Sequence, residues 1–235
     1  MINRNFNISV AMATFNGEKY INEQIDSILP QLCENDEIII SDDGSTDNTI
    51  QILKEYRDNR IKIICGSHKG VKQNFANAIS HCNGKYIFLS DQDDIWINNK
   101  VNNILNEFEK HKYSCIVHDC LAFDSNSGEV IIPSFFKFRK SKKGKWKNII
   151  KNSYIGCCMA FNSNLKNKIL PIPEEINMHD QWIGLIAEKY GKVKFINKIL
   201  LKYRRHDNNV SKLKHKSIKN MILDRYNLIK KLGET

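Results

Sequence analysis

The sequence has no apolar run that approaches the roughly 18 residues needed to cross a membrane, and it does not open with a signal peptide. We therefore expect a cytoplasmic chain that is soluble or peripheral to a membrane. Its seven cysteines include no CxxC pair and no disulfide-like spacing. In a cytoplasmic protein such cysteines are expected to be reduced thiols, and a zinc site is not indicated.

Two glycine-rich phosphate-binding patterns are also absent. The chain contains neither the Walker sequence GxxxxGK followed by Ser or Thr, nor the dinucleotide-binding sequence GxGxxG. Both patterns hold phosphates with backbone amides at the start of a helix. Any phosphate bound by this chain is therefore expected to be bridged by a metal ion rather than held in a backbone cradle.

Length and charge limit the possible partners. A chain of 235 residues with 41% hydrophobic and 26% charged residues is ordinary for a globular protein of one large domain or two intimate halves. The net charge of +10 is unevenly placed. Residues 1–125 carry 12 Lys and Arg against 18 Asp and Glu, whereas residues 126–235 carry 24 against 8. An acidic front half suits a metal site, and a basic back half suits phosphates, nucleic acid or an acidic membrane.

Short apolar runs alternate with segments of helical periodicity through the front half. This alternation predicts an α/β fold with a doubly wound, mostly parallel sheet flanked by helices. The expected strands are Ile8–Met12, Glu37–Ser41, Ile61–Cys65, Tyr86–Leu89 and Cys115–Cys120. Helices are expected over Lys19–Leu29, after Thr46 and Asp47, around Phe75–Ile79 and through Val101–Phe108.

The back half is less regular. Lys137–Lys151 packs eight Lys and Arg into fifteen residues, and we interpret it as a mobile basic segment or a plain solvated loop. Gly156–Phe161 is expected to be a strand on the floor of a site. A helix is expected from Gln181 to Tyr190, followed by two short strands, Val193–Ile196 and Ile199–Tyr203. A Lys-rich helical extension closes the chain.

Acidic residues stand where predicted strands end. Asp42 and Asp43 follow the second strand, and Asp91, Asp93 and Asp94 follow the fourth. Ligands of open α/β sheets bind outside the carboxyl ends of the strands. Three neighbouring carboxylates repel one another, so a divalent cation is expected to share the site. A carboxylate such as Asp43 could accept hydrogen bonds from a base or ribose, and Asp93 could bind a metal that bridges a diphosphate. The alternative is a solvated acidic turn that caps the next helix.

Six motifs occur together in a familiar order: MATFNGEKYINEQIDSIL, IIISDDGSTDNT, GVKQNFANAI, GKYIFLSDQDDIW, MHDQW and YRRHDNNVS. Their order and spacing resemble the family 2 glycosyltransferases of GT-A fold, of the bacterial surface-polysaccharide type. The resemblance covers most of residues 7–211. It implies one continuous domain, with residues 1–125 as the nucleotide-sugar-binding half and residues 126–235 as the acceptor-binding half.

The resemblance implies roles in binding the donor. Thr14 and Phe15 match the position under the nucleotide base, and Asp43 matches the carboxylate that recognises the base. Asp93 matches the main metal ligand of the DxD-like motif, and Asp91 a ribose or diphosphate contact; Gln92 is interpreted as a filler. A core Phe at position 15 and a helix-capping Asp43 remain alternatives.

The resemblance also implies roles in catalysis and in binding the diphosphate. Asp180 matches the general base that activates an acceptor hydroxyl, and its alternative is a helix cap. His206 matches a histidine that contacts the metal or the diphosphate. Arg204 and Arg205 match diphosphate partners, because guanidinium groups pair well with phosphate oxygens. His179 stands where many relatives have Glu, and no role follows for it.

The function implied is an inverting, Mn²⁺- or Mg²⁺-dependent transfer from a UDP- or dTDP-sugar to a saccharide or lipid-linked saccharide, in capsule, O-antigen or cell-wall polysaccharide synthesis. Peripheral contact with the anionic inner leaflet would suit such an acceptor. A sugar-nucleotide nucleotidyltransferase is one alternative, although Ser9–Gly17 is not the Gly/Arg-rich loop it needs. A basic nucleic-acid-binding protein is another, but the basic region has few aromatics and the acidic motifs would repel a polyanion. We therefore expect no nucleic-acid partner.

Overall fold

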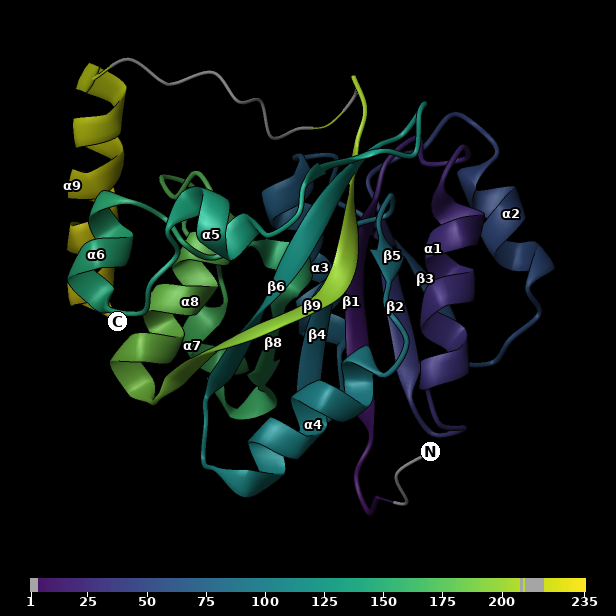
Figure 1. The fold of residues 1–235 in the computed structure, drawn as a ribbon, viewed down its shortest axis with the longest axis horizontal. Coiled ribbons are helices and arrows are strands. Elements are labelled where there is room, and N and C mark those ends of the chain that lie inside the picture. The colour runs from purple at the N-terminus through teal and green to yellow at the C-terminus, as the bar shows by residue number, and fades with distance from the viewer. Residues whose placement is uncertain (1–3, 208, 210–217) are drawn as a thin grey trace.

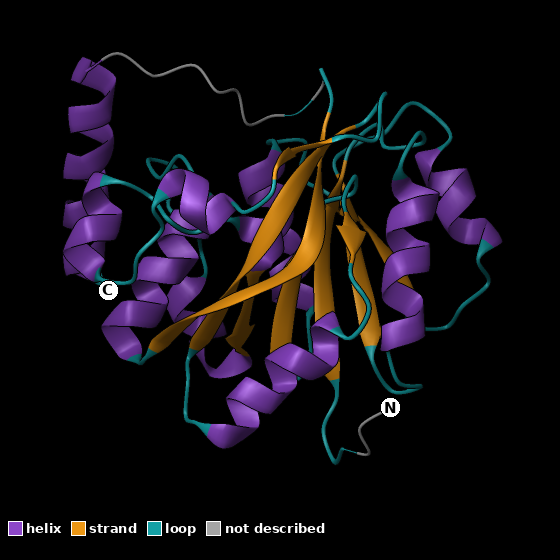
Figure 2. Cartoon of the chain, in the orientation of Figure 1, coloured by secondary structure: helices purple, strands orange, loops and turns teal. Residues whose placement is uncertain are grey.

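The computed structural model describes residues 4–207, 209 and 218–235, and Asn208, Val210 and Ser211 of the last motif lie outside the described residues. A nine-stranded sheet runs through the centre, flanked by helices (Figures 1 and 2). Its strands are β1 (Ile8–Thr14), β2 (Glu37–Asp42), β3 (Ile61–Cys65), β4 (Tyr86–Ser90), β5 (Ile95–Trp96), β6 (Cys115–Asp124), β7 (Val130–Ile132), β8 (Met159–Asn162) and β9 (Val193–Arg205). The helices are α1 (Ile21–Ile28), α2 (Thr49–Glu55), α3 (Val71–His81), α4 (Lys100–Lys110), α5 (Phe135–Arg139), α6 (Lys145–Ile150), α7 (Lys166–Ile169), α8 (His179–Tyr190) and α9 (Ile218–Glu234).

The strand order is β3-β2-β1-β4-β8-β6-β9-β5, with β7 paired to β6. Neighbours β3, β2, β1 and β4 are parallel, and so are β6 and β9. The short β8 is antiparallel to both β4 and β6, which places β6 in the same direction as β4. The predicted α/β fold with a mostly parallel sheet is confirmed. Both halves of the chain supply strands to this one sheet.

The front strands form where the sequence is apolar without alternation. All residues of β1, β2 and β4 are buried. Such continuous burial arises because helices cover both faces of a parallel sheet. Helix α1 shows the complementary pattern, with Ile21, Gln24, Ile25 and Ile28 buried at helical spacing. It ends at Ile28, and a 3-10 turn, Leu29–Gln31, follows with Pro30 in it.

Three predictions for the back half need correction. Gly156–Cys158 form a 3-10 helix rather than a strand, and the strand that follows is β8. The two short strands predicted after Gly191 are one strand, β9, whose pairing with β6 shifts register between Ile196 and Ile199. The basic segment is not a plain loop, because it contains the end of α5 and all of α6. Phe135, Phe136 and Ile149 bury their side chains there and fix both helices to the core.

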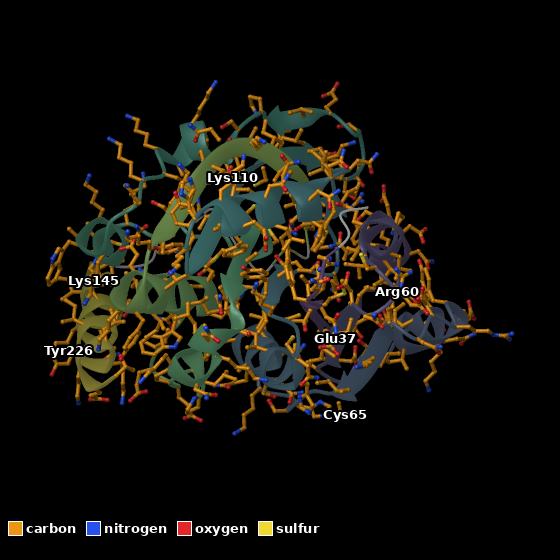
Figure 3. All side chains as sticks on the ribbon, turned by 90° about the horizontal axis from the view of Figure 1, so that it is seen from below. Glu37, Arg60, Cys65, Lys110, Lys145 and Tyr226 are labelled. Atoms are coloured by element: carbon orange, nitrogen blue, oxygen red, sulfur yellow. The ribbon has the colours of Figure 1, made fainter. Side chains whose placement is uncertain are left out.

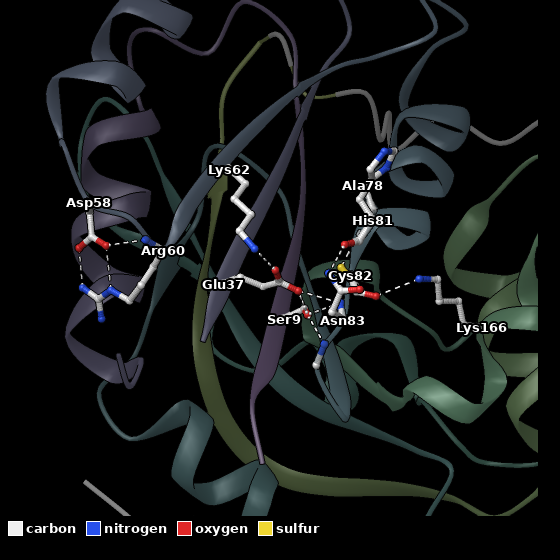
Figure 4. Close-up of polar contacts among 11 residues, drawn as sticks. Ser9, Glu37, Asp58, Arg60, Lys62, Ala78, His81, Cys82, Asn83 and Lys166 are labelled. Carbon is white, nitrogen blue, oxygen red and sulfur yellow. Dashed lines mark hydrogen bonds and ion pairs between the residues drawn. The ribbon is translucent and has the colours of Figure 1, made fainter. Parts of the chain in front are cut away.

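A charged network closes the amino-terminal end of the sheet, away from the strand ends that carry the acidic motifs (Figure 4). The buried Glu37 accepts hydrogen bonds of 2.7 Å from Ser9 Oγ, from Asn83 N and from Lys62 Nζ. Burial acts to raise the pKa of Glu37, but the bonds from Lys62, Ser9 and Asn83 outweigh it and lower that pKa. Glu37 is thus a structural acid whose two oxygens both have partners.

Candidate functional site

The carboxyl ends of β1, β2 and β4 meet at one edge of the sheet, the upper edge in Figure 1. Thr14 pairs with Asp42 across β1 and β2, and Met12 pairs with Ser90 across β1 and β4. The segments that follow these strands therefore start side by side. This register is what brings the motifs around residues 14, 42 and 91 to one place.

Asp42, the last residue of β2, and Asp43, the next residue, each accept hydrogen bonds from a different loop. Asp42 Oδ2 accepts from Thr14 Oγ1 at 2.8 Å, and Asp42 Oδ1 accepts from Ser45 N at 2.7 Å. Asp43 accepts from the amides of His68 and Gly70, both at 2.8 Å. Asp43 therefore orders the turn into α3 rather than capping α2. Thr14 is buried, and its hydroxyl is used within the protein.

Phe15 is a large apolar residue at this edge that reaches solvent, with 55% of its side chain exposed. Its backbone is held by Gln92, which accepts from Phe15 N at 2.8 Å and donates to Phe15 O at 3.0 Å. The exposed ring excludes the alternative of a core Phe. Gln92 was interpreted as a filler, and the structure shows instead that it ties the β4 motif to the β1 motif.

Asp93 and His206 lie together. His206 Nε2 is 2.7 Å from Asp93 Oδ2, and Asn209 Nδ2 is 3.2 Å from the same oxygen. The His206 ring also packs on Tyr20, with 4.7 Å between the ring centroids. Two segments more than a hundred residues apart thus form one polar cluster.

Arg204 is buried in the protein at the end of β9. Its backbone N–H donates to Asp94 Oδ1 at 3.0 Å, its Nε donates to the Asp93 carbonyl at 2.8 Å, and its guanidinium forms an ion pair with Glu23. The guanidinium lies between the rings of Tyr20 and Phe123, 4.8 and 4.7 Å from their centroids. Arg204 therefore fixes the acidic motif. Arg205 is half-buried, with its guanidinium 5.9 Å from the Tyr203 ring.

Asp91, Asp94 and Cys157 form a compact group with one potential ligand atom each, all within 4.8 Å of one another. Asp94 is fully buried, and its Oδ2 has no hydrogen-bond partner among the described residues. Burial and the charge of Asp93 raise the pKa of both Asp91 and Asp94. Unlike Glu37, Asp94 has an oxygen without a partner among the described residues, and the carboxylate oxygens of this group fit a hard divalent cation. The Cys157 thiol adds a softer donor.

Lys100 lies wholly buried beside this group and was not singled out from the sequence. Its Nζ donates to the Cys157 carbonyl at 2.9 Å and sits 3.9 Å from the centre of the Trp96 ring. Burial lowers the pKa of Lys100 to about 8, although the nearby thiols and Asp94 act against that shift. The positive charge of Lys100 offsets part of the negative charge of the acidic group. No ordinary sequence pattern marks a lysine of an amphipathic helix as buried.

Asp180 lies in the first turn of α8, which begins at His179. Its Oδ1 accepts from Gln181 N at 2.5 Å and from Asn152 Nδ2 at 3.3 Å. Burial raises the pKa of Asp180 to about 6, against the opposing effects of these bonds and of Arg139. The negative charge of Asp180 also acts on Asp91. Asp180 thus lies near Asp91.

His179 is part of the core next to this site. Its ring stacks on Phe75 with 4.1 Å between centroids, and burial lowers its pKa to about 3. A Cβ at Gly156 would lie 2.8 Å from His179 Nε2, so a larger residue there would displace the ring. His179 therefore remains a neutral packing residue that sets the position of the neighbouring Asp180.

The sequence is similar to that of known glycosyltransferases. The sequence model described as Glycosyl transferase family 2 matches residues 9–170. The chain is 28% identical over 217 residues to the UDP-Glc:alpha-D-GlcNAc-diphosphoundecaprenol beta-1,3-glucosyltransferase WfgD of Escherichia coli, covering 90% of this chain and 82% of WfgD. It is 30% identical over 213 residues to the dTDP-rhamnosyl transferase RfbG of Shigella flexneri, covering 84% and 72%.

Solved structures share the fold. A crystal structure of S. aureus TarS in complex with UDP-GlcNAc superposes with a TM-score of 0.76 at 18% identity, covering 96% of this chain and 66% of that one. The mannosyltransferase PcManGT from Pyrobaculum calidifontis, in complex with GDP-Man and Mn2+, gives a TM-score of 0.65 at 14% identity, covering 86% and 58%. The predicted GT-A-like architecture, with its carboxyl-terminal helix, is confirmed by this likeness.

Proposed function

Because the chain belongs to glycosyl transferase family 2, we propose that it moves a sugar from a UDP- or dTDP-sugar to a hydroxyl of a saccharide or lipid-linked saccharide, with inversion. The products would serve capsule, O-antigen or cell-wall polysaccharide synthesis. Relatives named for a UDP-sugar and for a dTDP-rhamnosyl donor support both nucleotide classes. The family also favours a glycosyltransferase over the two alternatives, a nucleotidyltransferase and a nucleic-acid-binding protein.

The observation that carries this proposal is the environment of Asp180. It is a buried carboxylate with a pKa of about 6, in the first turn of α8 and close enough to Asp91 to raise its pKa. A general base works best when its pKa lies near the operating pH. As the acceptor oxygen bonds to the anomeric carbon, Asp180 would take the hydroxyl proton, and the bond from that carbon to the nucleoside diphosphate would break. Attack opposite the leaving group inverts the anomeric centre.

A divalent ion, Mn²⁺ or Mg²⁺, would neutralise the diphosphate and stabilise it as a leaving group. Asp93 and His206 are the proposed ligands. The 2.7 Å between Asp93 Oδ2 and His206 Nε2 brings a carboxylate oxygen and an imidazole nitrogen, both possible metal ligands, to one place. The group of Asp91, Asp94 and Cys157 adjoins these two through Asp93 and offers the alternative position for the ion.

The remaining contacts proposed for the sugar donor depend on which side chains are exposed and which are already used within the protein. The Phe15 ring can stack on a base, because Gln92 fixes its backbone and its ring stays in solvent. Asp43 has one lone pair left on each oxygen for the base, and Asp91 can meet the ribose or diphosphate. Thr14 supports the base site through Asp42 rather than by a direct contact. Of the two arginines, Arg205 is the better candidate for a diphosphate contact, whereas Arg204 positions Asp93 and Asp94.

A lipid-linked acceptor would place the enzyme at the inner face of the cell membrane. No described helix is both long and apolar enough to cross a membrane. Peripheral contact with anionic lipid from the cytoplasmic side is therefore the form of association that we propose.

The test is a panel of UDP- and dTDP-sugars with Mn²⁺, scored by donor hydrolysis and thermal stabilisation, followed by Asp180→Asn. This variant should keep donor binding within about threefold and lose transfer by about a thousandfold or more, because it removes the proton acceptor. Glu188→Gln, on the same helix but bonded to Tyr154, is the matched control and should retain transfer. Near-normal transfer by Asp180→Asn would show that another group is the base.

A further inference from the structure

Helices α6 and α9 carry large apolar side chains that are exposed to solvent. Scattered exposed apolar residues are ordinary, but a contiguous patch of them marks a surface that meets another body. We call the six residues of this patch the α6–α9 face. Its members, with the exposed fraction of each side chain, are Trp146 (68%), Ile150 (65%), Ile222 (60%), Leu223 (55%), Tyr226 (61%) and Ile229 (46%).

The six side chains belong to one surface. Trp146 and Ile150 are four residues apart on α6, and Ile222, Tyr226 and Ile229 follow at steps of four and three on α9, so each set shares one side of its helix. Arg225 on α9 donates to the Ile150 carbonyl at 2.7 Å, which fixes the two helices beside each other. Figure 3 shows Lys145 and Tyr226 at the same edge of the molecule.

Folding does not account for this face. The opposite sides of the two helices already supply core residues, with Ile149 5%, Leu228 3% and Leu232 2% exposed. Lys189 on α8 adds a hydrogen bond of 2.7 Å to the Leu232 carbonyl. Both helices are therefore held by their inner sides, and the apolar outer sides remain available to a partner.

Charge around the face selects the partner. The sequence has no Asp or Glu between residues 130 and 173. Five exposed lysines lie on α6, α9 and the segments that flank α6: Lys142, Lys143, Lys147, Lys151 and Lys230. A second copy docked through the same patch would set these lysines against one another, because a twofold interface pairs a surface with itself. An apolar patch among lysines fits an anionic lipid surface instead.

We propose that the α6–α9 face docks the enzyme on an anionic phospholipid membrane. The six apolar side chains enter the boundary between headgroups and acyl chains, and the surrounding lysines lie among the headgroup phosphates. Docking extends beyond the sugar transfer proposed above, because it assigns a lipid-binding surface to residues that the reaction does not use.

The position of the α6–α9 face also suits a lipid-linked acceptor; this point rests on the proposed function. Gln181 Nε2, next to Asp180, donates to the Asn148 carbonyl of α6 at 2.7 Å. The face on the outer side of α6 thus lies about one helix diameter, about 10 Å, from the site of the base. A docked enzyme would hold Asp180 close to the headgroups, where the saccharide of a lipid-linked acceptor begins.

The experiment is vesicle flotation with the full chain. Phosphatidylcholine vesicles with about one third phosphatidylglycerol should bind it at low salt and release it at high salt, because lysine–headgroup attraction is screened. Pure phosphatidylcholine should bind it at least tenfold more weakly. The double variants Trp146→Ser with Ile150→Ser, and Ile222→Ser with Tyr226→Ser, should each lower binding about tenfold or more. Lys147→Gln with Lys151→Gln should lower it about fivefold for each lysine removed.

Val130→Ser with Ile131→Ser is the matched control, since these side chains are 54% and 51% exposed on β7. It should bind anionic vesicles like the wild type. Unchanged thermal unfolding and donor hydrolysis in solution would show that all variants fold and keep the donor site. Absence of wild-type binding to anionic vesicles at low salt would overturn the proposal, as would a dimer that the face variants dissociate. Donor hydrolysis without vesicle binding would refute docking alone and leave the proposed reaction standing.

Discussion

Asp180 illustrates how one carboxylate can be tuned by a few neighbours. Burial raises its pKa to about 6, while the Gln181 amide, Arg139 and Asn152 each favour the charged form. The position in the first turn of a helix acts in the same direction as these neighbours, since the helix amino terminus attracts negative charge. Burial prevails, and the group titrates just below neutral pH.

This balance predicts the pH dependence of transfer. The base must be ionised, so kcat/KM should rise with pH through about 6 and level off above 7. Asn152→Ala removes a donor that favours the ionised form and should move the midpoint upward by less than one pH unit. Asn164→Ala, at an exposed site, is the control and should leave the midpoint in place. A profile for Asn152→Ala that coincides with the wild type would contradict this account of the pKa.

The sequence indicated the charged residues that stand at strand ends. Asp43, Asp91 and Asp93 gather because of the strand register, and His206 was singled out by the motif that follows β9. Gln92 and Lys100 could not be found in this way. Each acts through contacts with residues more than fifty positions away, and neither residue type marks such a contact in the sequence.

At the scale of elements, helix α8 depends on the loop that precedes it. Lys72, on α3, donates from Nζ to the carbonyls of Pro173, Glu174 and Ile176, at 3.1, 2.8 and 2.9 Å. One ammonium group has three donors, and all three are used on this loop. The loop ends three residues before His179, so Lys72 sets where α8 begins and hence where Asp180 lies.

Lys72→Met should therefore lower the rate of transfer without changing donor binding. Loss of three charge-assisted hydrogen bonds lets the loop move, and a shift of about 1 Å at a catalytic group can cost about a hundredfold in rate. We expect a fall in kcat of about tenfold or more, measured with saturating acceptor, at an unchanged KM for the donor. Lys54→Met, at an exposed position of α2, is the matched control. An equal fall in both variants, or a rise in donor KM alone, would contradict a positioning role.

The elements themselves were predictable where burial on both faces leaves an unbroken apolar run, as in β1, β2 and β4. The sequence was misleading where local composition and tertiary contacts disagree. In α5 and α6 the many lysines indicated a solvated segment, but Ser134 caps α5 by accepting from Lys137 N, and Phe135 and Ile149 anchor the two helices. In β9 the polar pair Asn197 and Lys198 suggested a break, which the sheet accommodates as a shift in register.

At the scale of the whole molecule, the buried acids at the two ends of the sheet differ in their hydrogen-bond partners and in the direction of their pKa shifts. Glu37 at one end has a hydrogen-bond partner for each oxygen, and its pKa is lowered. At the other end, burial and the charge of Asp93 raise the pKa values of Asp91 and Asp94, and Asp94 Oδ2 has no partner among the described residues. A carboxylate whose folded-state pKa is raised stabilises the fold below its unfolded pKa, and that contribution is lost as pH rises through the folded-state value. Near neutral pH the site therefore lowers the stability of the metal-free protein.

A divalent cation should recover this loss. At a free concentration about a hundred times its Kd, a ligand of the native state adds about 2.7 kcal/mol, which corresponds to a rise in Tm of about 5 to 10 °C for a chain of this size. Mn²⁺, alone or with UDP, should thus raise Tm at pH 7.5, and should raise it less at pH 5.5, where protons compete for Asp91 and Asp94.

Tm is compared with and without Mn²⁺ at one pH. The opposite contributions of His118 and His179, whose pKa values are lowered by burial, therefore cancel. Asp58→Asn, in a surface ion pair with Arg60, is the control and should show the wild-type response. If Mn²⁺ with UDP leaves Tm unchanged at pH 7.5, the acids at the carboxyl end of the sheet do not form a cation site.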